Sequence, residues 1–118
     1  MNIMKKQIEN LFTDPQETMG NGLYFSGYEN EGEYKMWYNS GQLYEHYFYK
    51  DGRLDGEYKR WHKNRQLNKH CFFKYGKLDG EFKRWYDSGR LFKHCFFKDG
   101  KEYTIEDAKK KFPEGPWL

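Results

Sequence analysis

Three histidines recur at a fixed spacing, and a cysteine directly follows two of them. His46, His70 and His94 are 24 residues apart, and Cys71 and Cys95 follow the second and third of them. Imidazole nitrogen and thiolate sulfur are common zinc ligands in proteins. The first chemistry that this pattern suggests is therefore a metal site.

Geometry argues against that metal site. Equivalent residues in successive β-hairpins lie two strands apart, about 9.5 Å at ~4.8 Å per strand, whereas zinc ligands lie within about 2.3 Å of the metal. The same separation exceeds the ~7 Å between Cα atoms that a disulfide tolerates. His70 and Cys71 are also neighbours on one expected strand and point to opposite faces. We predict no metal, no cofactor and two free thiols, which fit a reducing compartment.

Other catalytic signals are also missing from the sequence. Asp55 and Asp79 each precede a glycine that opens a repeat, which is typical of turn residues rather than of an acid–base pair. The chain has no glycine-rich phosphate loop, nucleophile elbow or metal-carboxylate cluster. An active site needs one asymmetric constellation, whereas this chain has three similar units. We therefore predict that the protein is not an enzyme.

The recurring residues belong to an internal repeat of 24 residues. Three blocks that begin with Gly-Glu align without a gap, and the second and third are identical at 14 of 24 positions. Half a block precedes them, with Tyr24 at the place of Phe48. The array then covers residues 24–103, made of a half repeat at 24–31 and full repeats at 32–55, 56–79 and 80–103.

Each repeat predicts two strands separated by turns. In the second repeat we expect strands at 57–62 and 67–74, because their residues alternate between the two faces of a sheet. Tyr75-Gly76 provides the next reversal, since Gly supplies the positive φ of a tight hairpin turn. The fold is therefore predicted to be mainly β, a single-layer antiparallel β-meander of about three and a half hairpin repeats.

One turn departs from the pattern of its sister repeats. Arg65 stands where the other two repeats have Gly41 and Gly89. We expect Asn64 to take the left-handed conformation in place of Arg65, because Asn tolerates positive φ better than most residues.

The repeat resembles the MORN repeat. The resemblance rests on Gly-x-Tyr/Phe-x-x-Trp, then Ser-Gly-x-Leu, an aromatic pair and Asp-Gly-x-Leu-Asp-Gly, and it covers residues 24–103. The second MORN variant, known from bacterial antitoxin-component-like proteins and giant-virus proteins, is more similar still. This resemblance implies an elongated single-layer antiparallel sheet that curves into a groove. Arg65 departs from the motif, and the array ends where Glu102-Tyr103 replaces Leu-Asp.

The two ends of the chain are predicted to be caps. Residues 1–23 hold an expected helix at about 3–12 and a linker, and residues 104–118 hold an expected short helix and a tail. Thr104 begins a capping-box-like sequence, and Pro113 stops the helix after Phe112. Terminal edges of a repeat array need such cover. The alternatives are a helix packed along a sheet face and a tail that reaches a partner.

Aromatic rows on both faces are the most informative feature. One face carries the candidate binding residues Trp37, Trp61, Trp85, Phe48, Phe72 and Phe96. The other is expected to carry Tyr34, Tyr58 and Phe82 with Leu43, Leu67, Leu91 and the row Tyr49, Phe73 and Phe97. A single layer cannot bury both faces, and an uncovered row of Trp and Phe indicates an interface. We predict a protein-binding surface there, with Lys59, Arg60, Lys83 and Arg84 as a basic rim.

The favoured function is a non-enzymatic scaffold for protein–protein interaction through this aromatic groove. The resemblance implies either an antitoxin-like role, in which the groove masks a toxin, or a viral scaffold with its own client. A homodimer is the alternative to a different partner. We expect the protein in the cytoplasm, or in the host cytoplasm or virion if it is viral, since the N-terminus lacks the apolar block of a signal peptide.

Two other functions stay open. Aromatic and basic residues are mixed in the repeat at 56–79, which carries seven basic and two acidic residues, and single-stranded nucleic-acid binders use that mixture. Anionic lipid would also attract the Lys and Arg of repeats 2 and 3. Nucleic acid is disfavoured, because the chain's net charge is only +3 and Glu57, Asp79 and Glu81 are interspersed among the basic residues. Lipid is disfavoured, because no amphipathic basic helix or lipid anchor reinforces the basic residues.

Overall fold

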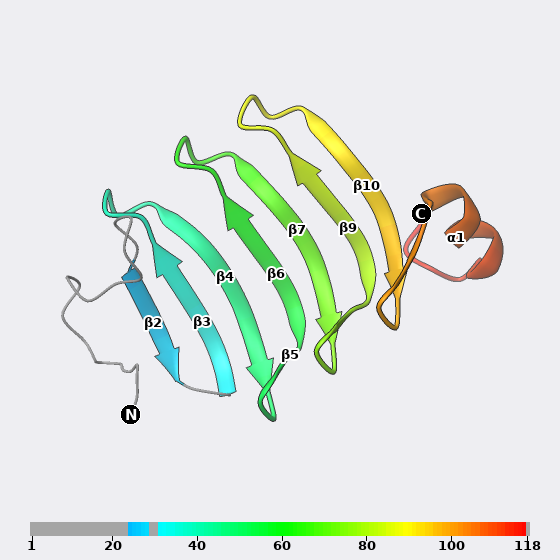
Figure 1. The fold of residues 1–118 in the computed structure, drawn as a ribbon, viewed down its shortest axis with the longest axis horizontal. Helices are drawn as coiled ribbons and strands as arrows, with labels where there is room; N and C mark the ends of the chain where they lie inside the picture. Colours follow the sequence, from blue (N-terminus) through cyan, green and yellow to red (C-terminus); the bar gives the residue numbers. More distant parts are fainter. Residues whose placement is uncertain (1–23, 29–30, 118) are drawn as a thin grey trace.

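A computed structural model describes the backbone of residues 24–28 and 31–117, and the side chains of residues 32–117. The helix and linker predicted at 1–23 lie outside the described residues. In the described part, ten strands form one antiparallel sheet, and a single helix follows them (Figure 1). The order of the main strands is β11-β10-β9-β7-β6-β4-β3-β2, so each strand lies beside its neighbours in sequence. The predicted β-meander is confirmed.

Each full repeat supplies two long strands. They are β3 (Glu31–Trp37) and β4 (Leu43–Lys50), β6 (Gly56–Trp61) and β7 (Leu67–Lys74), and β9 (Gly80–Trp85) and β10 (Leu91–Lys98). The strand predicted at 67–74 has those bounds, and the one predicted at 57–62 begins and ends one residue earlier. The edge strand β2 (Tyr24–Tyr28) precedes the repeats.

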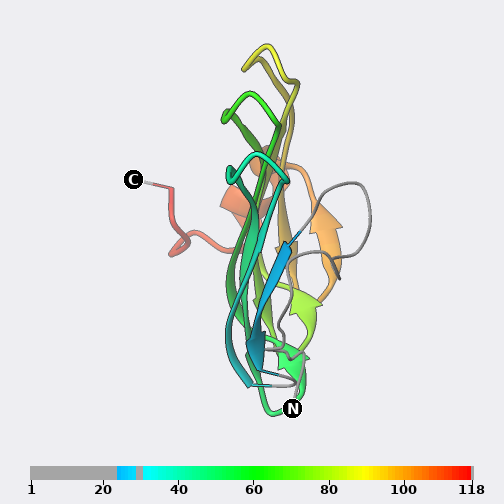
Figure 2. The same cartoon turned by 90° about the vertical axis from the view of Figure 1, so that its left-hand side faces the viewer.

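Three short strands were not anticipated. After each tight turn the chain folds back and pairs with the end of the long strand that it has just left. These strands are β5 (Arg53–Leu54), β8 (Lys77–Leu78) and β11 (Lys101–Tyr103). Figure 2, which views the sheet along its edge, shows how thin the single layer is, in agreement with extents of 49 × 35 × 20 Å.

The hairpin turns between repeats have the geometry that the sequence predicts. Asp51, Tyr75 and Asp99 have φ of 52°, 53° and 53°, and the glycine after each also has positive φ. Two successive residues with positive φ are typical of the tight turn that matches the twist of an antiparallel hairpin. Asp55 and Asp79 are turn residues, as predicted: their Oδ2 atoms accept hydrogen bonds from the backbone N–H of Tyr75 (3.2 Å) and Asp99 (3.3 Å).

The prediction for the Arg65 turn is wrong. Arg65 itself has φ of 77°, so it adopts the conformation of the glycines at this position. Asn64 is held in the role of the serine in the sister turns, because its Oδ1 accepts from Gln66 N (3.0 Å) and its Nδ2 donates to Asp87 O (2.6 Å). With Asn64 fixed in this way, the left-handed position falls on Arg65.

The half repeat does not continue the register of the full repeats. If Tyr24 were equivalent to Phe48, residue 21 would lie opposite Met36, as Glu45 lies opposite Arg60. Instead Phe25 pairs with Met36, a shift of four residues. The reason is that only two residues link β2 to β3, whereas the connection between full repeats is longer and folds back as β5 or β8.

One face of the sheet forms the core, and we call it the core face. It carries Tyr34, Tyr47, Tyr49, Tyr58, Cys71, Phe73, Phe82, Cys95 and Phe97. Its rings stack from strand to strand: Tyr47 lies 5.5 Å from Tyr34 and 5.6 Å from Tyr58 between ring centroids. Cys71 is fully buried at the centre of this cluster, so small thiol side chains fill the space between large rings.

The three leucines predicted on this face lie on the other one. In each hairpin the leucine that opens the second strand is opposite the tryptophan that ends the first: Leu43 with Trp37, Leu67 with Trp61, and Leu91 with Trp85. A register shift between these pairs and the rest of each ladder marks a β-bulge. Simple alternation fails there because a bulge inserts one residue into one strand.

Candidate interaction face

The face opposite the core is called the tryptophan face here. It carries Trp37, Trp61, Trp85, Phe48, Phe72, Phe96, His46, His70 and His94. Cross-strand pairing establishes this grouping, since Phe72 lies opposite Glu57 and His70 opposite Lys59 on the strand that ends in Trp61. The aromatic residues of the predicted binding surface therefore share one face, and the three tryptophans are half-buried.

A histidine–glutamate pair that we did not predict repeats on the tryptophan face. The His Nε2 to Glu Oε2 distance is 2.6 Å for His46–Glu33, 2.7 Å for His70–Glu57 and 3.0 Å for His94–Glu81. The signal was available, because Glu and His are 13 residues apart in every repeat. Among the described residues no group of three potential metal ligands comes together. The histidines therefore act as hydrogen-bond partners that join two strands.

The pairs also bear on the charge of this face. Burial, the largest single influence, raises the pKa of Glu57. The hydrogen bond from His70 and the positive charge of Lys59 oppose burial, and the net result is a lowered pKa. Glu57 is thus held in its charged form, and Lys59 Nζ lies 3.6 Å from its Oε2.

The phenylalanine row differs between the repeats. The ring of Phe48 lies 5.1 Å from the His46 ring, and Phe72 lies 5.2 Å from His70. Phe96 instead lies 5.7 Å from the ring of Phe112 and 5.0 Å from that of Trp117. Phe96 is consequently buried, with 6% of its surface exposed, whereas Phe48 and Phe72 are half-buried.

The C-terminal segment produces this difference. It consists of α1 (Ile105–Lys111) and the following turn, and it lies to one side of the sheet (Figure 2). Thr104 caps the helix as predicted, its Oγ1 accepting from Asp107 N at 3.0 Å. Trp117 Nε1 donates to Phe112 O at 2.7 Å, and this hydrogen bond holds the two aromatic residues close together. The segment lies beyond β10 at the end of the sheet (Figure 1), and its aromatic side chains pack on Phe96.

Two of the phenylalanines pack on the glycine that opens the following repeat, Phe48 on Gly56 and Phe72 on Gly80. Gly80 has φ of +125°, and a Cβ atom there would lie 3.4 Å from the Phe72 side chain. The ring of one repeat therefore packs directly on the backbone of the next. A larger residue at this position would strain both the backbone and the ring.

The predicted basic rim is divided between the two faces. Lys59 and Lys83 lie on the tryptophan face with the histidines opposite them. Arg60 and Arg84 follow them in sequence and lie on the core face, because neighbouring residues of a strand point to opposite sides. The four residues consequently do not surround one site.

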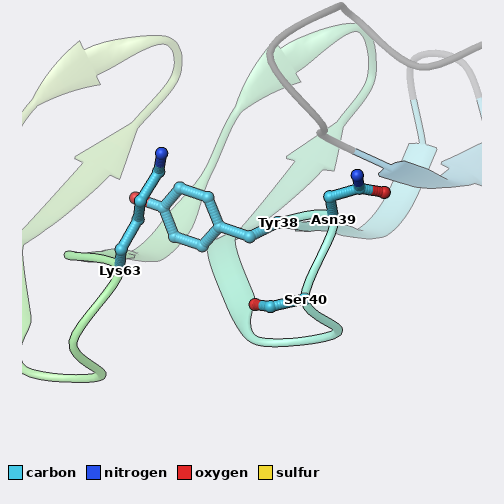
Figure 3. A pocket seen from close by; sticks show the side chains of 4 residues that line it. All are labelled: Tyr38, Asn39, Ser40 and Lys63. Carbon is cyan, nitrogen blue, oxygen red and sulfur yellow. The ribbon is translucent and has the colours of Figure 1, made fainter.

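Side chains at the turns connect one hairpin to the next. The Tyr38 hydroxyl donates to Trp61 O at 2.9 Å, and His62 Nε2 lies 2.9 Å from Trp85 O. A carbonyl oxygen only accepts, so Nε2 of His62 carries a proton. Beside Tyr38, a hollow of about 310 Å³ is lined by Tyr38, Asn39, Ser40 and Lys63 (Figure 3). We interpret this hollow as a result of the hydrogen bonds between neighbouring turns, not as a site with catalytic groups.

Comparison with known protein families agrees with this architecture. A family model described as "MORN repeat variant" matches the chain at residues 30–51 and 78–99. Each match contains the two long strands of a repeat and the turn between them, and the segment at 56–79 between the matches has the same structure. No curated protein and no solved structure matches the chain. No helix in the described part of the chain is long and apolar enough to cross a membrane.

Proposed function

We propose that this chain, which carries MORN repeats of the variant type, is a non-enzymatic scaffold that binds a protein partner through its tryptophan face. MORN repeats are generally protein- or lipid-interaction repeats, and they are a non-catalytic type. The observation that carries the proposal is that the rings of Phe112 and Trp117 pack against the ring of Phe96.

This packing matters because the position of Phe96 recurs in the two earlier repeats. Phe48 and Phe72 are equivalent to Phe96, and in the described part of the chain their ring partners are histidines of their own repeat. The half-buried Trp37 and Trp61 lie on the same face. A partner segment with aromatic side chains would cover Phe48 and Phe72 as the C-terminal segment covers Phe96. Aromatic side chains that pack in this way at an interface commonly dominate its binding energy.

Within this function, the partner and the setting are finer proposals. The resemblance to antitoxin-component-like proteins supports a toxin as the partner, and the resemblance to giant-virus proteins supports a scaffold client instead. A second copy of the chain is a further candidate partner. The two free cysteines support a reducing location, namely the cytoplasm, or the host cytoplasm or virion of a viral protein.

A pull-down from native lysate tests the proposal. The parent chain is compared with the double variant Trp61→Ala/Trp85→Ala and with Tyr75→Asn, which removes an exposed aromatic residue from a turn. We expect a stoichiometric protein that survives nuclease treatment, is retained by Tyr75→Asn and is lost by the double variant. Circular dichroism and thermal unfolding establish that each variant is folded. Equal retention by a folded double variant would refute the role of the tryptophan face.

The alternative function is binding of single-stranded nucleic acid or anionic lipid by the basic residues of repeats 2 and 3. It is supported by four basic residues that lie in one row on the core face, Arg60, Lys69, Arg84 and Lys93. This function requires a binding affinity that falls steeply as the salt concentration rises from low to moderate. Retention of nucleic acid alone, or flotation only with vesicles that contain anionic lipid, would favour it over the scaffold.

A further inference from the structure

A row of four positive side chains crosses the core face. Arg60, Lys69, Arg84 and Lys93 lie on β6, β7, β9 and β10, and each is the cross-strand partner of the next. Adjacent strands are about 4.8 Å apart, so the row places like charges close together. Such a row is costly unless negative charges accompany it.

Only the two ends of the row have such a partner in the described part of the chain. Arg60 donates to Glu45 Oε2 from Nη2 (3.0 Å) and Nε (3.3 Å). At the other end, Lys93 Nζ lies 3.4 Å from Glu102 Oε2. The two middle members, Lys69 and Arg84, have no carboxylate within salt-bridge distance among the described side chains.

The repeat itself explains why Arg84 is left without a carboxylate. Arg60 and Arg84 occupy the same repeat position, and so do the residues opposite them on the preceding strand, Glu45 and Lys69. The junction between the first and second repeats thus pairs Glu with Arg. The junction between the second and third sets Lys beside Arg.

The atoms of Arg84 show the consequence. Its guanidinium lies 5.2 Å from the centre of the Phe92 ring, and its Nε is buried with no hydrogen-bond acceptor among the described residues. The neighbouring Asn68 has a buried Oδ1 that is also unpaired. Buried polar atoms are nearly always hydrogen-bonded in proteins, so an unpaired guanidinium N–H indicates a missing acceptor.

Lys69 shows the same deficit of negative charge. Burial lowers the pKa of Lys69 most strongly. Cys71 and Glu45 raise this pKa, the positive charges of Arg60 and Arg84 lower it further, and the net result is a lowered pKa. The Lys69 Nζ lies between two rings, 5.3 Å from the centre of Tyr58 and 5.5 Å from that of Phe82. The two aromatic faces therefore contribute negative potential at this ammonium group, in addition to the charge of Glu45.

We propose that Arg84 and Lys69 form a second binding site, which accepts a carboxylate side chain from an acidic segment of a partner polypeptide. Glu45 on Arg60 shows the occupant that the equivalent position accepts within the chain. The guanidinium fork suits a carboxylate because it offers two N–H donors in one plane. The site is reachable beside Phe92, whose ring lies against the Arg84 guanidinium and is 42% exposed. It lies on the face opposite the tryptophans, so it stands or falls independently of the proposed function.

The test is a titration of the isotope-labelled full chain, followed by NMR at the Nε–H signal of Arg84. The probe is an acetylated and amidated tetra-glutamate peptide, and its matched control is the tetra-glutamine peptide. We expect the tetra-glutamate peptide alone to shift the Arg84 signal. Inorganic phosphate and vesicles that contain phosphatidylserine are titrated in the same way, because a phosphate group is the competing ligand.

Lys69→Glu tests the mechanism, since it places a carboxylate beside Arg84 as Glu45 lies beside Arg60. We expect this variant to bind the peptide at least about tenfold more weakly, the loss of one charge-assisted pair, and to unfold at a higher temperature. Lys74→Glu changes the same charge at an exposed position of the same strand, and we expect it to bind like the parent. An unshifted Arg84 signal, equal binding by Lys69→Glu, or a preference for phosphate or vesicles would overturn the proposal.

Discussion

Arg60 holds the carboxylate of Glu45 across the junction of two repeats. The guanidinium donates to one carboxylate oxygen through both Nη2 and Nε, and Nη2 also donates to the Tyr58 hydroxyl at 2.8 Å. Glu45 is 8% exposed, so this is an anion inside an aromatic layer, and the Arg60 guanidinium balances its charge. The pair links β4 to β6 at the point where one repeat must dock on the next.

We predict that Glu45→Ala destabilises the protein by about 2–3 kcal/mol, because it leaves the Arg60 guanidinium half-buried without its acceptor. Denaturant unfolding measures the change. Met36 occupies the position of Arg60 in the first repeat, so Arg60→Met added to Glu45→Ala should recover much of the loss. Glu114→Ala, at an exposed glutamate, serves as the control. A double variant no more stable than Glu45→Ala would contradict this account.

Arg65→Gly should stabilise the fold by about 0.5–1 kcal/mol. Arg65 has φ of 77°, a conformation that costs a residue with a Cβ about 1–2 kcal/mol, and the entropy of Gly in the unfolded chain offsets part of the gain. Thermal unfolding of Arg65→Gly and Arg65→Ala separates the backbone effect from the loss of the side chain. The backbone explanation is wrong if both variants shift the midpoint equally.

Both thiols should react slowly in the folded protein. Cys71 and Cys95 are 0% and 4% exposed, and burial raises the pKa of each thiol to about 11, so little reactive thiolate is present near neutral pH. Ellman's reagent added with and without denaturant measures the two rates. We expect both cysteines to react at once in the unfolded chain. A fast phase of one equivalent under native conditions would show that one thiol is accessible.

The same pKa shifts predict loss of stability in alkali. A thiol with a pKa raised from 9.0 to about 11 on folding stabilises the fold fully below pH 9.0, and that contribution disappears as the pH rises to about 11. Burial also raises the pKa of Tyr47, which acts in the same direction. Urea unfolding across this range should show a falling free energy of unfolding, and Cys71→Ala should show a shallower fall. A profile of equal slope in the variant would argue against the thiol contribution.

Acid should weaken the histidine–glutamate pair of the second repeat. The pKa of Glu57 is lowered in the folded state. Its contribution to stability is therefore present above the ordinary value of 4.5 and is lost as the pH falls through the lower, folded value. Glu57→Gln should flatten this part of the stability profile, measured by urea unfolding below about pH 5. Glu114→Gln, at an exposed position, is the control, and the prediction fails if both variants retain the slope of the parent.

Local pattern was sufficient for much of the fold. The alternation of Leu67–Lys74 and the Gly at position 76 are signals within one hairpin, and the strand and the turn lie where they were predicted. The prediction for Asn64 failed because the deciding contact, from Asn64 Nδ2 to Asp87 O, reaches a turn 23 residues away. The positions of Leu67 and its two equivalents failed because a β-bulge leaves no local mark in an alternating sequence.

The candidate sites also have some features that the sequence predicts and others that only the tertiary structure decides. Strand alternation, together with the pairing of the two strands within one hairpin, places Trp61 and Phe72 on one face, since side chains of a strand alternate with a period of two residues. That Phe96 is buried while Phe72 is only half-buried depends on the path of the chain after Tyr103, which only the folded structure decides. The missing carboxylate beside Arg84 is likewise invisible in one repeat. It emerges when cross-strand pairing sets each repeat beside the next, because identical positions then meet different neighbours.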